Sequence, residues 1–113
     1  MHESDRSPNG GALTIEVERD GATLVISPRG RLDISTTQAL DVVLREGVDS
    51  DAPKVILDLR GLSFIDSTGL RLLVFAAARS HKNGDRLRMM RGSEAVERVL
   101  LVSGLEQSLP FLN

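Results

Sequence analysis

Residues 55–78 have the sequence VILDLRGLSFIDSTGLRLLVFAAA, in which a strand pattern is followed closely by a helix pattern. The first five residues are almost all aliphatic, as expected for a strand that is covered on both faces of a sheet. Residues 60–65 are expected to form a short loop, and residues 67–80 a helix that begins after Asp66. The middle of that helix, residues 72–78, is apolar almost all round, so we expect it to be buried on more than one side.

Two strands joined by a hairpin turn are expected before this stretch. Residues 13–18 alternate between apolar and polar side chains, which is the period of a half-buried strand. Asp20-Gly21 is a strong hairpin signal, and residues 23–26 predict the returning strand. Because Pro28 has no amide donor, it is expected to end the regular pairing of this strand or to lie where a donor would face solvent.

A first helix is predicted between the hairpin and residue 50. Ser35 is expected to be its N-cap, with Gln38 reaching back to complete a capping box. One helical stripe then carries four aliphatic residues, Leu40, Val43, Leu44 and Val48. The stripe predicts that this helix packs one face against the rest of the domain.

Three elements are predicted after the apolar helix. Residues 86–89 alternate again and indicate a strand, and Ser93 is expected to cap a third helix that ends at Gly104. Residues 109–112 are expected to add a short final strand, which Pro110 confines to an edge. The complete order ββαβαβα(β) predicts a single α/β domain, with a mixed sheet of four to five strands and helices packed on it.

The composition of the 113 residues agrees with one small domain and excludes several kinds of function. Hydrophobic residues make up 41% of the chain and aromatic residues 3%, and the net charge is −2. Few aromatics and a slightly acidic balance argue against binding of nucleic acid or of an anionic membrane. The absence of cysteine excludes disulfides, thiolate zinc sites and thiol nucleophiles.

The polar residues 1–11 are expected to form a disordered N-terminal tail, and residues 12–113 the domain. The tail lacks the apolar segment of a signal peptide, and no apolar run in the chain approaches the roughly 18 residues of a membrane span. We therefore expect a cytoplasmic protein that does not bind a membrane.

No catalytic apparatus is visible in the sequence. It contains no Walker-type phosphate loop, no GxGxxG and no GxSxG. His2 and His81 are more typical of solvated histidines than of metal ligands. Asp49 and Asp51 are typical of acidic loop residues. We expect neither an enzyme nor a bound cofactor or metal.

The residues that stand out are Asp66-Ser67-Thr68-Gly69, between the buried strand and the apolar helix. One interpretation is structural: Asp66 or Ser67 caps the helix, and Gly69 allows close packing. The other is functional, because free amides and the helix dipole at a helix N-terminus also suit a phosphoryl group on the Ser67 hydroxyl. The residues alone leave both interpretations open.

Residues 62–70, LSFIDSTGL, follow the strand pattern and resemble the signature of the STAS domain, the family that includes the bacterial anti-sigma factor antagonists. Gly30-Arg31-Leu32-Asp33 resembles the Gly-x-Leu-Asp at the end of the family's second strand. Ser103-Gly104-Leu105 resembles the motif that closes its third helix. These matches run in the family's order over residues 13–112.

The resemblance implies a phosphorylation switch without a cofactor. In this family an anti-sigma factor, which is also a serine kinase of the GHKL type, binds the unphosphorylated antagonist and so frees the sigma factor. The kinase phosphorylates the Ser that follows Asp in the motif, here Ser67. The phosphorylated antagonist then dissociates from the kinase, and a PP2C-type phosphatase removes the phosphate and restores binding. The residues expected to bind the partner are Asp33, Asp66, Ser67, Thr68 and Gly69, which match the family's motifs, together with Arg71. The free protein is expected to be a monomer.

Two features depart from the family pattern. Arg71 stands where many relatives have Gly, one helical turn after Ser67, and is either a solvent-facing residue or a contact to phosphate or partner. Relatives usually continue into a further helix, whereas this sequence ends at Asn113, so we expect part of the fold to be uncovered or closed differently. For Asp33, which follows the pattern, a turn residue and a partner contact are both open interpretations.

Two other functions stay open at this stage. One is a STAS interaction module of a transporter or signalling assembly that is never phosphorylated, although its motif would more often lack the Ser67 hydroxyl. The other is a small nucleotide-binding protein that uses the helix N-terminus at Ser67. A calorimetric titration with ATP and GTP that shows no heat of binding would exclude the nucleotide-binding function.

Overall fold

The computed structural model describes residues 12–112, so the disordered tail predicted for residues 1–11 lies outside the described residues. Within them the chain forms one sheet whose strands are β1 (Leu13–Asp20), β2 (Thr23–Leu32), β3 (Lys54–Asp58), β4 (Leu62–Ile65) and β5 (Leu87–Met90). The helices are α1 (Thr37–Val48), α2 (Ser67–Lys82) and α3 (Glu94–Ser103), followed by the short 3-10 helix η1 (Glu106–Ser108). The predicted class, a single α/β domain with a mixed sheet, is confirmed.

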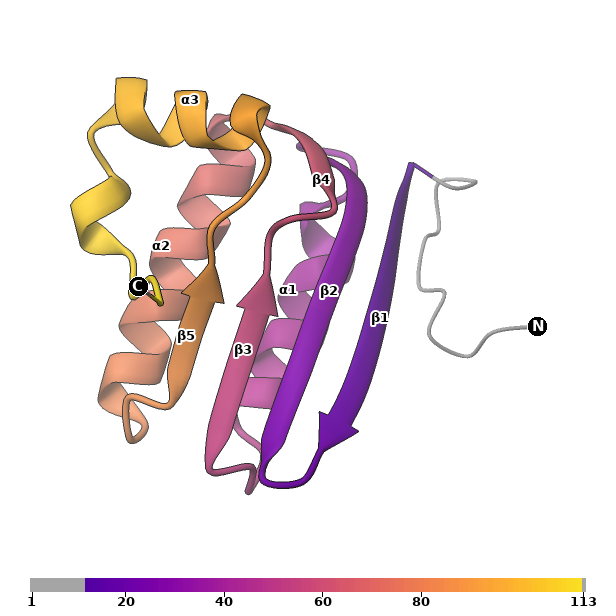
Figure 1. The fold of residues 1–113 in the computed structure, drawn as a ribbon, viewed down its shortest axis with the longest axis vertical. Helices are drawn as coiled ribbons and strands as arrows, with labels where there is room; N and C mark the ends of the chain where they lie inside the picture. Colours follow the sequence, from indigo (N-terminus) through magenta and orange to yellow (C-terminus); the bar gives the residue numbers. More distant parts are fainter. Residues whose placement is uncertain (1–11, 113) are drawn as a thin grey trace.

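The strands lie in the order β1-β2-β3-β5, and β4 also pairs with β2. β1 and β2 form an antiparallel hairpin, whereas the other pairs are parallel. α1 and α2 lie on one face of the sheet, and α3 lies at the end where β2 and β4 finish (Figure 1). The core fills the space between that face and the helices, and its fully buried side chains include Leu13, Ile15, Ile26, Leu57, Leu73 and Met89.

β4 corrects the expectation of a loop over residues 60–65. β2 is ten residues long, which gives it room for two parallel neighbours. It pairs with β3 through Thr23–Ile26 and then with β4 through Gly30–Leu32. The second half of the expected loop is therefore a strand, because β2 extends beyond the end of β3.

Pro28 does not end β2, so the first of the two expected alternatives is wrong. The proline lies where no amide is needed. The amide of Gly30 donates to the β4 side, to Gly61 O at 3.0 Å. The next amide, that of Arg31, donates to the β1 side, to Ala12 O at 2.8 Å. Successive amides of a strand point to opposite sides, so position 28 faces the gap between β3 and β4. β2 therefore continues through the proline without losing a backbone hydrogen bond to β3 or to β4.

The expected helix over residues 67–80 is confirmed as α2, but its expected burial is wrong in part. Leu73 is fully buried and Leu72 is 8% exposed, whereas Phe75 is 63% exposed. One side of α2 packs on the sheet and a second side on α1. The third side, which carries Phe75, is left largely open to solvent.

Both caps predicted for the third helix are confirmed. The Ser93 hydroxyl accepts an amide of the first turn of α3, and Gly104 ends the helix in the left-handed conformation at φ +74°. The final strand expected over residues 109–112 is reduced to one parallel bridge, in which Phe111 lies beside Met89 of β5. The Leu112 amide donates to Met89 O at 2.9 Å.

Gly69 sets how closely α2 approaches β2 and β4. A Cβ at this position would lie 2.8 Å from Ile65 Cγ1 and 2.9 Å from the carbonyl oxygen of Leu32. We predict that Gly69→Ala lowers the free energy of unfolding by about 1–3 kcal/mol, although alanine is the better helix former. Urea denaturation followed by circular dichroism measures the change.

Gly47→Ala is the matched control, because Gly47 is also buried within a helix. The three atoms nearest to its added Cβ would be side-chain methyl groups and not backbone: Ile26 Cδ1 at 3.0 Å, Leu24 Cδ2 at 3.4 Å and Val55 Cγ1 at 3.6 Å. The effect of this control should stay within about 1 kcal/mol. A Gly69→Ala protein as stable as the wild type would contradict the close approach of α2 to the sheet.

Candidate functional site

Asp33 and Asp66 follow two neighbouring parallel strands, β2 and β4. Leu32 and Ile65 face each other at the ends of these strands, and the Asp66 amide donates to Leu32 O at 3.2 Å. Open α/β sheets commonly build their sites at this carboxyl edge. The structure thus brings together the two acidic segments that the sequence motifs singled out.

The Asp66 carboxylate organises the start of α2. Its Oδ1 accepts the Gly69 amide at 3.0 Å and the Thr68 hydroxyl at 2.6 Å, so Asp66 is the N-cap. The Ile34 amide, from the loop after β2, also donates to this carboxylate. Desolvation by partial burial acts to raise the pKa of Asp66, but these hydrogen bonds outweigh it and hold the pKa below its usual range.

Ser67 and Thr68 are adjacent hydroxyl residues with different surroundings. Ser67 is the first residue of α2 and is exposed. Within residues 12–112 its hydroxyl has no hydrogen-bond partner. Thr68 is half-buried, and its hydroxyl donates to Asp66. The cap therefore occupies the Thr68 hydroxyl and leaves the Ser67 hydroxyl available to an external group.

The loop after β2 corrects the predicted capping box. α1 begins at Thr37 with Thr36, not Ser35, as its N-cap. Ser35 instead donates its amide and its hydroxyl to Asp33 Oδ1, at 3.0 and 2.6 Å. The buried Thr36 hydroxyl donates to the Arg31 carbonyl at 2.8 Å and makes no cap bond. These two bonds, one of them charge-assisted, hold the Ser35 side chain in the turn with Asp33 instead of at the first amides of α1.

The hydrogen bonds of this turn also keep the Asp33 carboxylate ionised. The Ser35 hydroxyl is the main group that lowers the pKa of Asp33; desolvation opposes it, and the Ser35 amide and the Arg31 guanidinium lower the pKa further. Arg31 Nε lies 3.6 Å from the carboxylate. Asp33 is therefore a turn residue by its hydrogen bonds, and it adds a second negative charge to this edge of the sheet.

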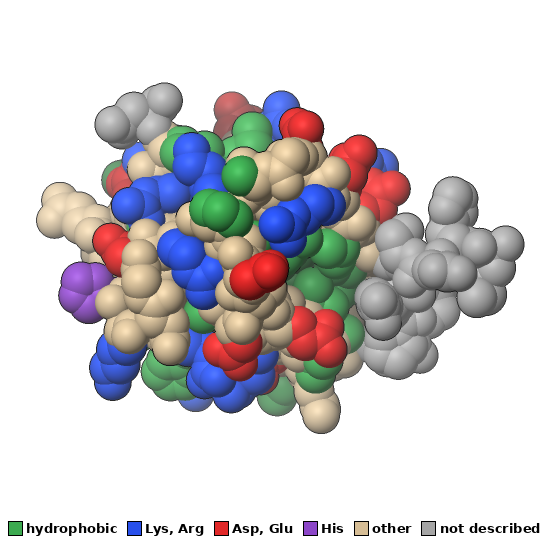
Figure 2. Space-filling model, turned by 90° about the horizontal axis from the view of Figure 1, so that it is seen from below, with side chains coloured by type: hydrophobic (Ala, Val, Ile, Leu, Met, Phe, Trp, Pro, Cys, Tyr) green, Lys and Arg blue, Asp and Glu red, His purple; other side chains and the backbone are tan. Residues whose placement is uncertain are grey.

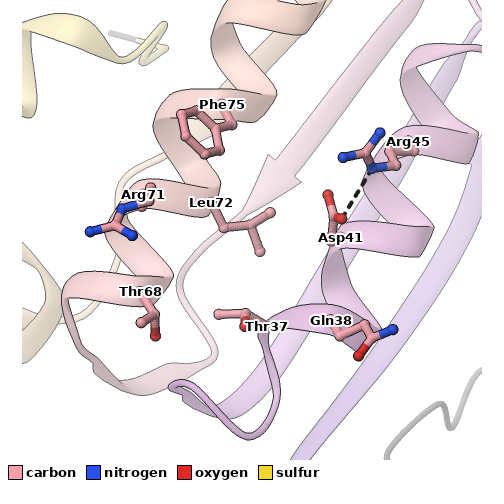
Figure 3. Close-up of a pocket in the computed structure, with 8 residues that line it drawn as sticks. All are labelled: Thr37, Gln38, Asp41, Arg45, Thr68, Arg71, Leu72 and Phe75. Atoms are coloured by element: carbon pink, nitrogen blue, oxygen red, sulfur yellow. Dashed lines mark hydrogen bonds and ion pairs between the residues drawn. The ribbon is translucent and has the colours of Figure 1, made fainter.

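Arg71 lies one turn beyond Ser67, at a groove between α1 and α2 that sequence reasoning missed (Figure 3). This α1–α2 groove has a volume of about 410 Å³ and is lined by Thr37, Gln38, Asp41 and Arg45 of α1 and by Thr68, Arg71, Leu72 and Phe75 of α2. The apolar run of α2 was the available signal. This run alone does not indicate a groove, because the sequence does not tell that α1 packs beside α2 and leaves Phe75 uncovered.

The described residues provide no metal site and no membrane span. Among residues 12–112, no three His, Cys, Asp or Glu side chains are placed to hold a metal ion. No described helix combines the length and apolar character needed to cross a bilayer. Figure 2 shows acidic and basic side chains interspersed over the end of the molecule that is seen from below.

Comparison with known proteins gives the family. A family model described as "Mlab, STAS domain" matches residues 15–112. The chain is 29% identical to anti-sigma-F factor antagonist RsfB of Mycobacterium tuberculosis, over 86% of this chain and 79% of that protein. It is 26% identical to the anti-sigma F factor antagonist of Paenibacillus polymyxa, over 88% of this chain and 86% of that protein.

A solved structure agrees with these relatives. The crystal structure of an anti-sigma factor antagonist from Mycobacterium paratuberculosis matches with a TM-score of 0.75 and 27% identity, over 93% of this chain and 87% of that one. The chain belongs to the STAS domain family. The resemblance that the sequence motifs indicated is thereby confirmed.

The lowered pKa of Asp66 makes stability depend on pH in acid. A carboxylate with a lower pKa in the folded chain stabilises the fold fully above the unfolded value of about 3.9, and this stability is lost as pH falls through the native pKa. We predict that the free energy of unfolding falls between about pH 5 and 3. It should fall less for Asp66→Asn, which still caps the helix but does not titrate. Urea unfolding at stepped pH measures both slopes.

The control for this titration is Glu18→Gln, at an exposed position of β1 far from the cap in the fold. Its slope measures how far the loss of a carboxylate outside the cap changes the pH dependence. If the stability of Asp66→Asn falls as steeply as that of the wild type, the hydrogen bonds to Asp66 do not favour its ionised form.

Proposed function

We propose that this protein is an anti-sigma factor antagonist whose switch is phosphorylation of Ser67. Unphosphorylated, it binds an anti-sigma factor that is also a serine kinase of the GHKL type, and so releases the sigma factor. The observation that carries the proposal is the available Ser67 hydroxyl beside the capping Asp66, in a STAS domain whose relatives are named anti-sigma factor antagonists. The protein would act in the cytoplasm as a binding protein, with nucleotide and magnesium held by the kinase.

Phosphorylation needs no group from this chain other than the acceptor hydroxyl. Ser67 Oγ attacks the γ-phosphorus of ATP held by the kinase and forms the new O–P bond. The bond from the γ-phosphorus to the oxygen that bridges it to the β-phosphate breaks, ADP leaves, and the hydroxyl proton passes to a base of the kinase. Attack by Thr68 would first have to break its 2.6 Å bond to Asp66. This difference favours Ser67 as the acceptor.

The phosphate would change the binding surface more than the fold. It adds about −1.5 to −2 charges near two carboxylates that hydrogen bonds keep ionised, Asp33 and Asp66. A partner surface fitted to a neutral hydroxyl is then repelled. The phosphate also lies at the N-terminus of the 16-residue helix α2, whose dipole favours negative charge. The fold can therefore persist while the interface fails, and a PP2C-type phosphatase would restore binding.

We predict that Ser67 is the sole efficient phosphoacceptor. After incubation with ATP and a GHKL-type anti-sigma factor encoded in the same genome, intact-mass spectrometry should find one added phosphate on the wild type and none on Ser67→Ala. Thr68→Ala is the control, because it removes the neighbouring hydroxyl and should still be phosphorylated. A fully phosphorylated Ser67→Ala protein would show that Ser67 is not the phosphoacceptor. A wild type that binds this kinase and stays unmodified would favour an interaction module without the switch.

We further predict that Arg71 stabilises the phosphorylated state. Positions 67 and 71 are one helical turn apart, so the guanidinium can reach a phosphate on Ser67 and offer it two donors. At this exposed place the contact should contribute about 0.5–2 kcal/mol. Thermal melts of both forms, each as wild type and Arg71→Ala, make a double-mutant cycle, in which the phosphorylated form should lose more stability. Equal losses in the two forms would leave Arg71 as a surface residue or a partner contact.

A further inference from the structure

The charge of the α1–α2 groove is opposite to that of the whole chain. The chain has a net charge of −2, yet the groove and its continuation along α2 carry three arginines, Arg45, Arg71 and Arg79, against one carboxylate, Asp41. Arg45 pairs with Asp41 at 3.0 Å, and Arg79 pairs with Asp49 at 3.3 Å. Within residues 12–112, Arg71 has no carboxylate partner. Among the residues that line the groove, Arg71 is therefore a positive charge without an ion pair, at the end nearest the proposed phosphorylation site; the carboxylates of Asp33 and Asp66 lie outside this lining.

The floor and one wall of the groove are apolar. Leu72 is nearly buried at the floor, and Phe75 stands beside it as a largely exposed aromatic ring (Figure 3). Leu44, Val48 and Ala76 continue this lining along the two helices. An exposed aromatic side chain next to buried aliphatic groups is typical of an anchor point for a protein partner.

We infer that the α1–α2 groove docks an amphipathic helix of the anti-sigma factor kinase, apolar where it meets Leu72 and Phe75 and acidic on the flank that faces Arg71. The inference rests on the proposed function and extends the interface beyond Ser67. The α2 side of the groove runs from Thr68 to Arg79, about 16 Å along the helix axis. This length fits about three turns of a helix laid in the groove.

The position of the groove supports the same partner. Thr68 both lines the groove and adjoins Ser67, so one protein can fill the groove while its active site reaches the hydroxyl. A second copy of this chain is the other occupant to be tested, because Leu101 and Val102 of α3 are 72% and 81% exposed. These two side chains are apolar, but the charged residue one helical turn before them is Arg98, which would not complement Arg71.

The first test is calorimetry with the kinase that phosphorylates the wild type. Phe75→Ser and Arg71→Glu should each weaken binding by at least about tenfold. Val42→Ser is the matched control, because Val42 is an exposed apolar residue of α1, 49% exposed, that does not line the groove. It should change the affinity less than about twofold. Circular dichroism checks that each variant is folded.

The outcomes separate the two proposals. Affinities of Phe75→Ser and Arg71→Glu equal to that of the wild type would overturn the groove interface and leave the proposed function standing. A wild type that neither binds nor is phosphorylated by any such kinase would overturn the function, and with it the inference that rests on it.

The second test identifies the occupant. Because the chain contains no cysteine, Gln38→Cys and Glu18→Cys each place a single photoreactive maleimide, the first at the lining of the groove and the second at an exposed position of β1 away from it. After irradiation of the complex, the probe at position 38 should label a helical segment of the kinase that carries acidic residues, and the probe at position 18 should not. Labelling of a segment without acidic residues, or of a second copy of this chain, would overturn the proposed occupant.

Discussion

The site depends on the hydrogen bonds that converge on the carboxylate of Asp66. This carboxylate caps α2 through the Gly69 amide, occupies the Thr68 hydroxyl and accepts the Ile34 amide from the neighbouring loop. The bonds fix the start of α2 beside the end of β2 and leave the Ser67 hydroxyl facing outward. They also keep the carboxylate ionised, so that a fixed negative charge stands beside that hydroxyl.

The acidic edge of the sheet could be predicted from the sequence, because Asp33 closes the Gly-x-Leu-Asp motif and Asp66 lies within LSFIDSTGL, each after a strand pattern. β4 could not, because its four residues pair with the part of β2 beyond Pro28, and only the tertiary structure brings these two segments together. The predicted Ser35 cap is wrong because hydrogen bonds to a carboxylate two residues away hold Ser35 in the turn before α1. The exposure of Phe75 could not be predicted from helical periodicity, which does not tell how many sides of α2 find a neighbour.

Arg71 connects the proposed phosphorylation site with the α1–α2 groove. In the unmodified protein its guanidinium is the uncompensated charge at the groove's edge. A phosphate on Ser67 would attract that guanidinium across one helical turn. The acidic side of the partner would then be repelled by the phosphate. It would also lose its attraction to Arg71, because that guanidinium is paired with the phosphate. One modification could in this way weaken two parts of the interface without unfolding the domain.

The central claim is that phosphorylation of Ser67 changes binding and leaves the fold intact. Calorimetric titration of the kinase with the unmodified and the phosphorylated protein, together with a thermal melt of each form, measures both properties. We expect the phosphorylated form to bind at least about tenfold more weakly, a difference of about 1.4 kcal/mol, and to melt cooperatively like the unmodified form. Equal affinities, or a phosphorylated protein that no longer melts as a folded domain, would contradict the claim.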